Sequence, residues 1–333
     1  MSFRRVADKQ TVTIMAGGIA MKNKELHIAL TLGVLLPCMM LLLACQPGWN
    51  LPSIFPTEAT EPSESGAFRV LMADGTVQGM DLEDYIWGVV LAEMPASYEV
   101  EALKAQAVAA RTYALRTKRH ENANICTDYG CCQAYVRPEN YTGGAKFSEK
   151  VRQAVLSTAG QVVTYAGELI EATYFSCSGG RTEDAAAVWG ADVPYLQSVP
   201  SPGEENSSDY MKTVSMSAEE FAAAFDGLSG TPGSWIGKIT YTNGGGVATI
   251  EIGGTEYKGT TVRQKLKLRS TAFVITVVGS SVSITTKGFG HRVGLSQDGA
   301  EAMAVGGSDY ADILAHYYPG TRLQGIDNIG ALG

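Results

Sequence analysis

Residues 81–119 read D-L-E-D-Y-I-W-G-V-V-L-A-E-M-P-A-S-Y-E-V-E-A-L-K-A-Q-A-V-A-A-R-T-Y-A-L-R-T-K-R, and this stretch predicts two helices joined by a sharp corner. Asp81 is a good N-cap, so the first helix is expected to begin directly after it. Pro95 disfavours helical backbone at Met94, which ends that helix. The second helix is predicted from about Tyr98 to Lys118.

A carboxyl group occupies an apolar position near the end of the first helix. Apolar residues recur at helical spacing at Leu82, Ile86, Val89 and Val90, and Glu93 lies three and four residues beyond the last two. Glu93 is therefore a candidate proton donor, or else one end of a structural ion pair. Burial would raise the pKa of this carboxyl, whereas a nearby cation would lower it.

The second helix carries two candidate cations. Lys104 and Arg111 are seven residues apart, so they stand on one face of the helix. Together with Glu93 they predict a binding groove for a polar substrate. The alternative is that one of them is the ion-pair partner of Glu93. Gln106 lies roughly opposite and is interpreted as structural.

The composition sets limits on the class of protein. The chain has 333 residues and a net charge of -8. This length is enough for one large core or two small ones. The acidic balance argues against a nucleic-acid partner.

The amino-terminal part predicts a membrane anchor. Residues 27–45 are almost wholly apolar and contain no Asp, Glu, Lys or Arg. A run of about 19 residues can just span a bilayer, and the lysines before it place residues 1–26 in the cytoplasm. Met21 is an alternative start of the chain. A lipoprotein signal ending at Cys45 is the rival interpretation, and residues 46–67 are predicted to be a linker.

The remaining chain predicts an α+β fold behind this anchor. Residues 68–202 and 287–333 are expected to form a helical catalytic core with β-hairpins, one before the first helix and one over residues 161–175. Residues 203–286 show alternating strands separated by glycine turns, which predicts a β-rich inserted subdomain. Trp189 and Tyr195 are interpreted as platforms for a ligand or as buried anchors.

Four of the six cysteines lie in the predicted folded body. Outside the cytoplasm, the default expectation for them is disulfide bonding. His120, Cys126 and Cys132 are separated by five residues each and are alternatively a zinc site, with one position left for water or a fourth ligand. Both interpretations stay open. We expect such a zinc to be structural.

Several segments resemble one protein family. Residues 88–114, the run Y-F-S-C-S-G-G-R-T-E from Tyr174, the segment 188–199 and the run G-F-G-H-R-V-G-L-S-Q-D-G-A from Gly288 are all similar to the SpoIID/LytB family. The resemblance covers nearly all of the chain from about residue 66. Arg292 departs from the pattern because the family usually has glycine after the histidine, so the shape of this loop is open.

The resemblance implies a peptidoglycan lytic transglycosylase. Such an enzyme cleaves the bond between N-acetylmuramic acid and N-acetylglucosamine in glycan strands, here expected to be peptide-free, and leaves 1,6-anhydro ends. Glu93 would be the single catalytic acid and base. The substrate-binding residues implied by the matched motifs are Lys104, Arg111, Tyr174, Ser176, Tyr195, His291, Ser296 and Gln297.

The resemblance also implies a setting. Clostridial members carry a His-Cys-Cys zinc site, which here would be His120, Cys126 and Cys132, and no cofactor is expected for catalysis itself. The implied role is engulfment during sporulation, alongside an amidase and other membrane proteins. The implied location is the mother-cell membrane, crossed once, with the body in the intermembrane space. Two alternatives remain: a non-catalytic wall-binding amidase enhancer, and a hydrolase that uses zinc.

Overall fold

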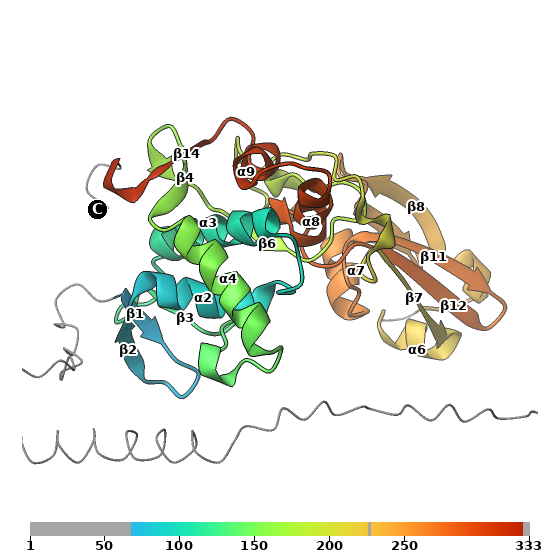
Figure 1. Ribbon diagram of the computed structural model, residues 1–333. Helices are drawn as coiled ribbons and strands as arrows, with labels where there is room; N and C mark the ends of the chain where they lie inside the picture. Colours follow the sequence, from blue (N-terminus) through green and yellow to red (C-terminus); the bar gives the residue numbers. More distant parts are fainter. Residues whose placement is uncertain (1–67, 226–227, 329–333) are drawn as a thin grey trace, which may run out of the picture. The chain divides into compact units, whose positions relative to one another are not determined.

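The computed structural model describes residues 68–225 and 228–328 (Figure 1). Helices and strands are both present, which confirms the predicted α+β class. No helix in this part of the chain combines the length and the apolar character needed to cross a bilayer. The cytoplasmic segment, anchor and linker predicted over residues 1–26, 27–45 and 46–67 lie outside the described residues.

Three helices lie side by side in the part of the fold that is drawn on the left of Figure 1: α2 (Leu82–Glu93), α3 (Val100–Arg116) and α4 (Ala145–Ser157). The predicted start of α2 is confirmed, because the Asp81 carboxylate accepts hydrogen bonds from the backbone N–H groups of Glu83 and Asp84 at 2.8 and 3.3 Å. The second helix is two residues shorter at each end than predicted.

Helix α3 is buried on opposite sides by two apolar clusters. Leu103, Ala107 and Ala110 pack with residues of α2 and α4. Ala105 and Val108 pack with residues of α8 (Gln297–Val305) and α9 (Tyr310–Tyr317). The small side chains allow other helices to pack closely against α3 from two directions. Helix α3 therefore takes part in both apolar clusters of the core.

The strands of the core form small sheets. β1 (Phe68–Leu71) and β2 (Val77–Met80) make the predicted hairpin, and β3 (Ile125–Cys126) joins β1 in parallel. β4 (Gln161–Tyr165) lies between β5 (Glu168–Leu169) and β14 (Arg322–Gly325).

The second predicted hairpin is only partly correct. β4 and β5 do pair, but β6 (Tyr174–Phe175) leaves them and pairs in parallel with β13 (Leu295–Ser296). This pairing brings the segments after Tyr174 and after Gly288, far apart in the sequence, next to each other. The short helix α5 (Ala185–Trp189) follows the first of these segments.

The segment predicted to be β-rich contains two three-stranded antiparallel sheets. One has the order β11 (Ala272–Val278), β12 (Ser281–Lys287), β7 (Met211–Ser217), and the other has β10 (Thr255–Lys258), β9 (Val247–Ile252), β8 (Ile236–Tyr241). Helices α6 (Ala218–Ala223) and α7 (Gly259–Lys265) accompany them. Phe221, Trp235 and Ile250 belong to a separate apolar cluster here.

Candidate active site

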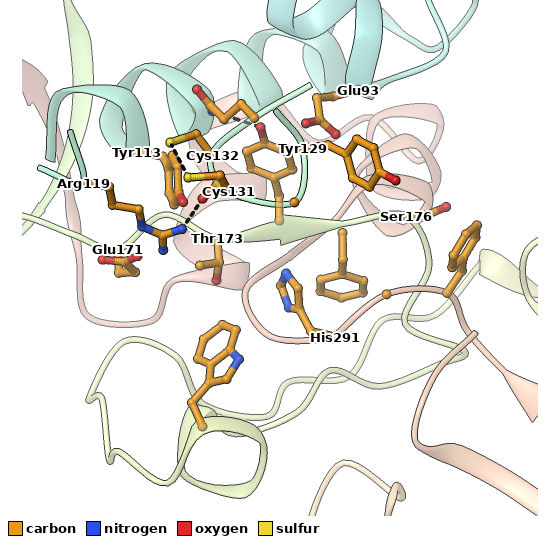
Figure 2. A pocket seen from close by; sticks show the side chains of 17 residues that line it. Glu93, Tyr113, Arg119, Tyr129, Cys131, Cys132, Glu171, Thr173, Ser176 and His291 are labelled. Carbon is orange, nitrogen blue, oxygen red and sulfur yellow. Dashed lines mark hydrogen bonds between the residues drawn. The ribbon is translucent and has the colours of Figure 1, made fainter. Parts of the chain in front are cut away.

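The carboxyl group of Glu93 lies at the end of α2 and faces a cavity of about 770 Å³. The helix ends there because Met94 adopts extended backbone before Pro95. Tyr174, Ser176 and His291 line the same cavity. Figure 2 shows Glu93 and His291 projecting into it from above and below.

Hydrogen bonds hold the Glu93 carboxyl in place. The backbone N–H of Ala134 donates to Glu93 Oε1 at 2.6 Å, and the Tyr174 hydroxyl makes a second hydrogen bond. The Tyr174 hydroxyl itself accepts from Gln133 Nε2 at 2.9 Å, and Gln133 Oε1 accepts from the Tyr85 hydroxyl at 3.1 Å. This chain fixes the direction in which the carboxyl points.

Burial raises the pKa of Glu93, and the hydrogen bonds from Ala134 and Tyr174 oppose that rise without cancelling it. Within the described residues no ion pair joins Glu93 to a cation. The structural ion pair considered from the sequence is therefore absent at Glu93. Desolvation dominates, which favours the protonated acid.

A second cavity, of about 410 Å³, meets the first at Glu93. Ser176 lines both cavities, and Gln297 lines the second. Gln297 donates to Gln106 Oε1 at 3.3 Å, and Gln106 is fully buried, as its predicted structural role requires. Glu93 thus lies between two cavities. A group in this position can reach an internal bond of a bound polymer whose two sides occupy the two cavities.

Other carboxylates in these cavities are already partnered. Glu171 pairs with Arg116 at 3.2 Å, and Asp209 pairs with Arg269 at 3.0 Å. Asp298 accepts hydrogen bonds from the hydroxyls of Tyr98 and Ser207, both at 2.5 Å. Of these groups, Glu93 is the one best suited to hold and release a proton.

His291 forms part of the cavity wall as a neutral imidazole. Its ring packs against Phe175 and Trp189, with centroids 5.5 and 5.2 Å away. The backbone N–H of Val293 donates to His291 Nδ1 at 3.1 Å. Burial lowers the pKa of His291 to about 4, and the charge of Arg263 adds to this effect. His291 is therefore suited to hydrogen bonding rather than to ion pairing at neutral pH.

The predicted juxtaposition of Lys104 and Arg111 with Glu93 is not found. Arg111 is fully buried, and its Nη2 lies 2.5 Å from Glu83 Oε2. Lys104 pairs with Glu101 at 2.7 Å. Helices α2 and α3 are connected by a short turn and pack antiparallel to each other. A residue late in α3 therefore meets the start of α2 and not its end.

Two further residues predicted to bind substrate belong to the framework. Tyr195 is buried, and its hydroxyl accepts the backbone N–H of Glu171 at 3.1 Å. Ser296 is fully buried, caps α8 and donates to Glu204 at 2.5 Å. Trp189, the other aromatic considered, is 47% exposed and lines the Glu93 cavity. Tyr195 is thus a buried anchor, whereas Trp189 stays a candidate platform for a ligand.

A cluster of metal-ligating side chains borders the Glu93 cavity. The ligand atoms of His120, Cys126, Cys131 and Cys132 all lie within 4.8 Å of one another. His120 Nε2 is 3.7 and 3.4 Å from the sulfurs of Cys131 and Cys132, which are 3.8 Å apart. Tetrahedral zinc requires about 3.8 Å between two sulfurs and about 3.6 Å between sulfur and nitrogen. The three distances among His120, Cys131 and Cys132 fit that geometry.

Cys131 is a candidate ligand that the sequence prediction did not include. The three predicted ligands left one coordination position open, and Cys131 supplies a fourth group. A closed set of four protein ligands is typical of structural zinc and does not favour a catalytic zinc. No disulfide joins the cysteines of the described residues. The sequence does place Cys131 directly beside Cys132. The prediction used the even spacing of His120, Cys126 and Cys132 and therefore did not include Cys131.

The backbone conformation of Arg292 defines the shape of the loop after His291, which the sequence left open. Its φ is 67°, the left-handed conformation that glycine adopts most readily, so the loop follows a glycine-like path. The buried guanidinium donates to the carbonyl oxygens of Ser178, Arg181 and Gly244 at 2.6 to 2.7 Å and pairs with Glu183 at 3.3 Å. These contacts hold it in a conformation that is unusual for a long side chain.

The described part of the chain is thus an α+β protein with one carboxyl acid between two cavities and a His-Cys cluster at its edge. Residues 73–165 match the family model described as Stage II sporulation protein, SpoIID. Two relatives named Stage II sporulation protein D, which are 38% and 40% identical over most of their length, show that the chain belongs to this family.

Individual relatives cover most of the chain. Stage II sporulation protein D of Bacillus amyloliquefaciens is 38% identical over 285 residues, 82% of each chain. The protein of the same name from Bacillus subtilis (strain 168) is 40% identical over 267 residues, 77% of this chain and 78% of that one. An amidase enhancer of Bacillus subtilis (strain 168) is 32% identical over 291 residues, 71% of this chain and 40% of its own length.

Proposed function

We propose that this protein is a peptidoglycan lytic transglycosylase that acts on peptide-free glycan strands during sporulation. Membership of the SpoIID family and the similarity to an amidase enhancer support a role at the cell wall in sporulation. The observation that carries the enzymatic proposal is the position of Glu93. Its carboxyl is partly buried, lies between two cavities and pairs with no cation among the described residues.

A single acid is enough for this reaction. Glu93 donates its proton to the glycosidic oxygen as the bond from the anomeric carbon to that oxygen breaks. The C6 hydroxyl oxygen of the same N-acetylmuramic acid bonds to the anomeric carbon, and the Glu93 carboxylate takes the hydroxyl proton. The acid is restored, no water enters, and the products are a free hydroxyl and a 1,6-anhydro ring. Ordinary glycosidases need two carboxyl groups instead.

Neighbouring residues position the acid and the sugar. Tyr174 orients the Glu93 carboxyl through its hydroxyl, while His291 and Ser176 face the cavity that would hold the sugar. Gln297 lies in the adjoining cavity. Arg111 and Lys104 are left out of this assignment because their charges are paired elsewhere.

The proposed reaction takes place at a membrane, outside the cytoplasm. Residues 27–45 anchor the chain in the mother-cell membrane, with the body outside the cytoplasm. His120, Cys126, Cys131 and Cys132 would hold a structural zinc ion, which would tie the segment after α3 to β3 and the cavity wall. A sporulation amidase and other engulfment membrane proteins are the expected partners.

Mass spectrometry of digested, peptide-free glycan strands tests the enzymatic proposal. The wild-type chain is expected to leave 1,6-anhydro ends. Glu93→Gln, which keeps the shape of the side chain, is expected to lower the rate about a hundred- to ten-thousandfold with an unchanged thermal midpoint.

Other products would point to other functions. Reducing ends would mean hydrolysis. Intact strands, combined with stimulation of an amidase, would support the second candidate, an enhancer, which the amidase-enhancer relative favours. Undiminished cleavage by Glu93→Gln would remove Glu93 from the mechanism.

A further inference from the structure

A third cavity, of about 650 Å³, adjoins the candidate active site. It lies between α5 on the core side and strands β8 and β9 on the β-rich side, and its lining includes Tyr241, Asn243 and Lys258. Trp189 lines both this cavity and the one that contains Glu93. The two cavities are therefore neighbours with one indole ring as their common wall.

The aromatic residues of this cavity are presented to solvent. Tyr241 is 60% exposed and Trp189 is 47% exposed, although the core would be the usual place for such rings. Trp189 is also packed against His291, which ties it to the active-site wall. Exposed rings of this kind offer flat apolar surfaces, against which the C–H face of a sugar ring can pack.

Polar groups complete the cavity. Asn243 Nδ2 donates to Asp184 Oδ2 at 3.0 Å, which leaves the amide oxygen of Asn243 available as an acceptor. Lys258 is exposed, and no ion pair involves it in the described part of the chain. An amide acceptor and a free cation suit the acetamido groups and the lactyl carboxylate of a peptide-free glycan strand.

The β-rich wall of this cavity is fixed to the core. Glu183 Oε1 accepts from the Thr242 hydroxyl at 2.8 Å and from the backbone N–H of Gly246 at 2.9 Å. Arg292 holds the carbonyl of Gly244 in the same turn. The turn that carries Asn243 is thus held in position before any ligand arrives, which lowers the entropy cost of binding.

We propose that this third cavity is a distal subsite for the glycan strand that Glu93 cleaves. The proposal rests on the proposed function for its ligand, and on the shared Trp189 for its continuity with the active site. A long strand would contact Trp189, Tyr241 and Lys258 while its scissile bond lies at Glu93. A short oligosaccharide would occupy only the cavity at Glu93.

Binding measurements in the full-length chain test the distal subsite. Glu93→Gln serves as the background, so that no strand is consumed. The probes are peptide-free glycan strands separated into tetrasaccharides and long strands. Tyr241→Ala and Lys258→Ala are expected to weaken binding of long strands, by about tenfold for Tyr241→Ala, and to leave tetrasaccharide binding unchanged. Trp189→Ala is expected to weaken both.

Matched controls come from α4. Phe147 and Lys146 are exposed there, outside both cavities, and Phe147→Ala and Lys146→Ala are expected to bind every strand normally. Normal binding of long strands by Tyr241→Ala, or no binding of long strands by the background, would overturn the distal subsite. Failure of the proposed function shows separately, as the absence of anhydro ends from the wild-type chain.

Discussion

Glu93 combines the two properties that a general acid needs near neutral pH. Burial makes its charged form costly, so the proton is retained, while the cavity keeps the carboxyl within reach of a ligand. The Tyr174 hydroxyl acts in the opposite sense, because a hydrogen bond to the carboxylate stabilises charge. The balance between these effects sets the pH range in which the proposed reaction runs.

The balance predicts how activity depends on pH. Because Glu93 must start protonated, kcat/KM should fall as pH rises through its pKa, and that fall should lie above the ordinary range of a glutamate. Tyr174→Phe removes an interaction that lowers the pKa, so the fall should move to higher pH. A pH profile of kcat/KM for both chains measures this. A shift to lower pH would contradict the assigned hydrogen bond.

Sequence reasoning found Glu93 because a carboxyl interrupts an otherwise apolar helical repeat. The same reasoning misplaced Arg111, whose spacing from Lys104 says which face of α3 it occupies but not what covers that face. The predictions for Tyr195 and Ser296 were wrong for a similar reason. Both lie in matched motifs, yet the motif does not say whether a side chain faces the cavity or the core.

At the scale of elements, the antiparallel run of α2 and α3 makes Arg111 a structural residue. Arg111→Met would leave Glu83 without its buried partner, so the free energy of unfolding should fall by about 3–5 kcal/mol. Lys104→Met breaks a more exposed pair and should cost less than about 1 kcal/mol. Urea unfolding compares the two. A stable Arg111→Met chain with impaired glycan binding would instead support the groove role first predicted.

The His-Cys cluster gives a second prediction at this scale. Metal analysis of anaerobically purified protein should find about one zinc ion per chain. Cys131→Ser should lose most of it and lower the thermal midpoint by about 5–10 °C. Cys177→Ala is the control, because that cysteine is buried elsewhere and should leave the zinc in place. Absence of zinc together with loss of free thiols would indicate disulfides.

The ends of the elements were more predictable than their pairing. Asp81 and Pro95 mark α2 by local chemistry, which a sequence displays directly. The parallel pairing of Tyr174 with Leu295 joins residues that are far apart in the chain, and no local sequence pattern predicts it. The hairpin predicted over residues 161–175 is therefore correct for β4 and β5 but not for β6, which pairs with β13 instead.

At the scale of the whole described fold, one buried ion pair links the core to the β-rich segment. Arg292 and Glu183 bind each other, and both also hold the turn at residues 242–246. The more exposed pair of Arg269 and Asp209 lies within the β-rich segment itself. The family resemblance implied that Arg292 stands where glycine is usual, but it did not show that the charge has a buried partner.

A double-mutant cycle measures this link. Arg292→Gly relieves the left-handed backbone yet leaves Glu183 buried without a cation, so the free energy of unfolding should fall by about 3–5 kcal/mol. Adding Glu183→Gln to that variant should restore part of the loss, because no uncompensated charge remains. Arg269→Ala is the comparison and should cost less than about 1 kcal/mol. Additive losses would mean that the two residues act independently.

The indole shared by two cavities has a consequence for how far digestion proceeds. A glycan strand that is bound on both sides of Trp189 would lose its contact with Tyr241 once the strand becomes too short to reach that residue. Under the proposed function, each cut would therefore produce a poorer substrate than the one before. Digestion would slow by itself and leave fragments of limiting size, so the sacculus would be thinned and loosened rather than dissolved.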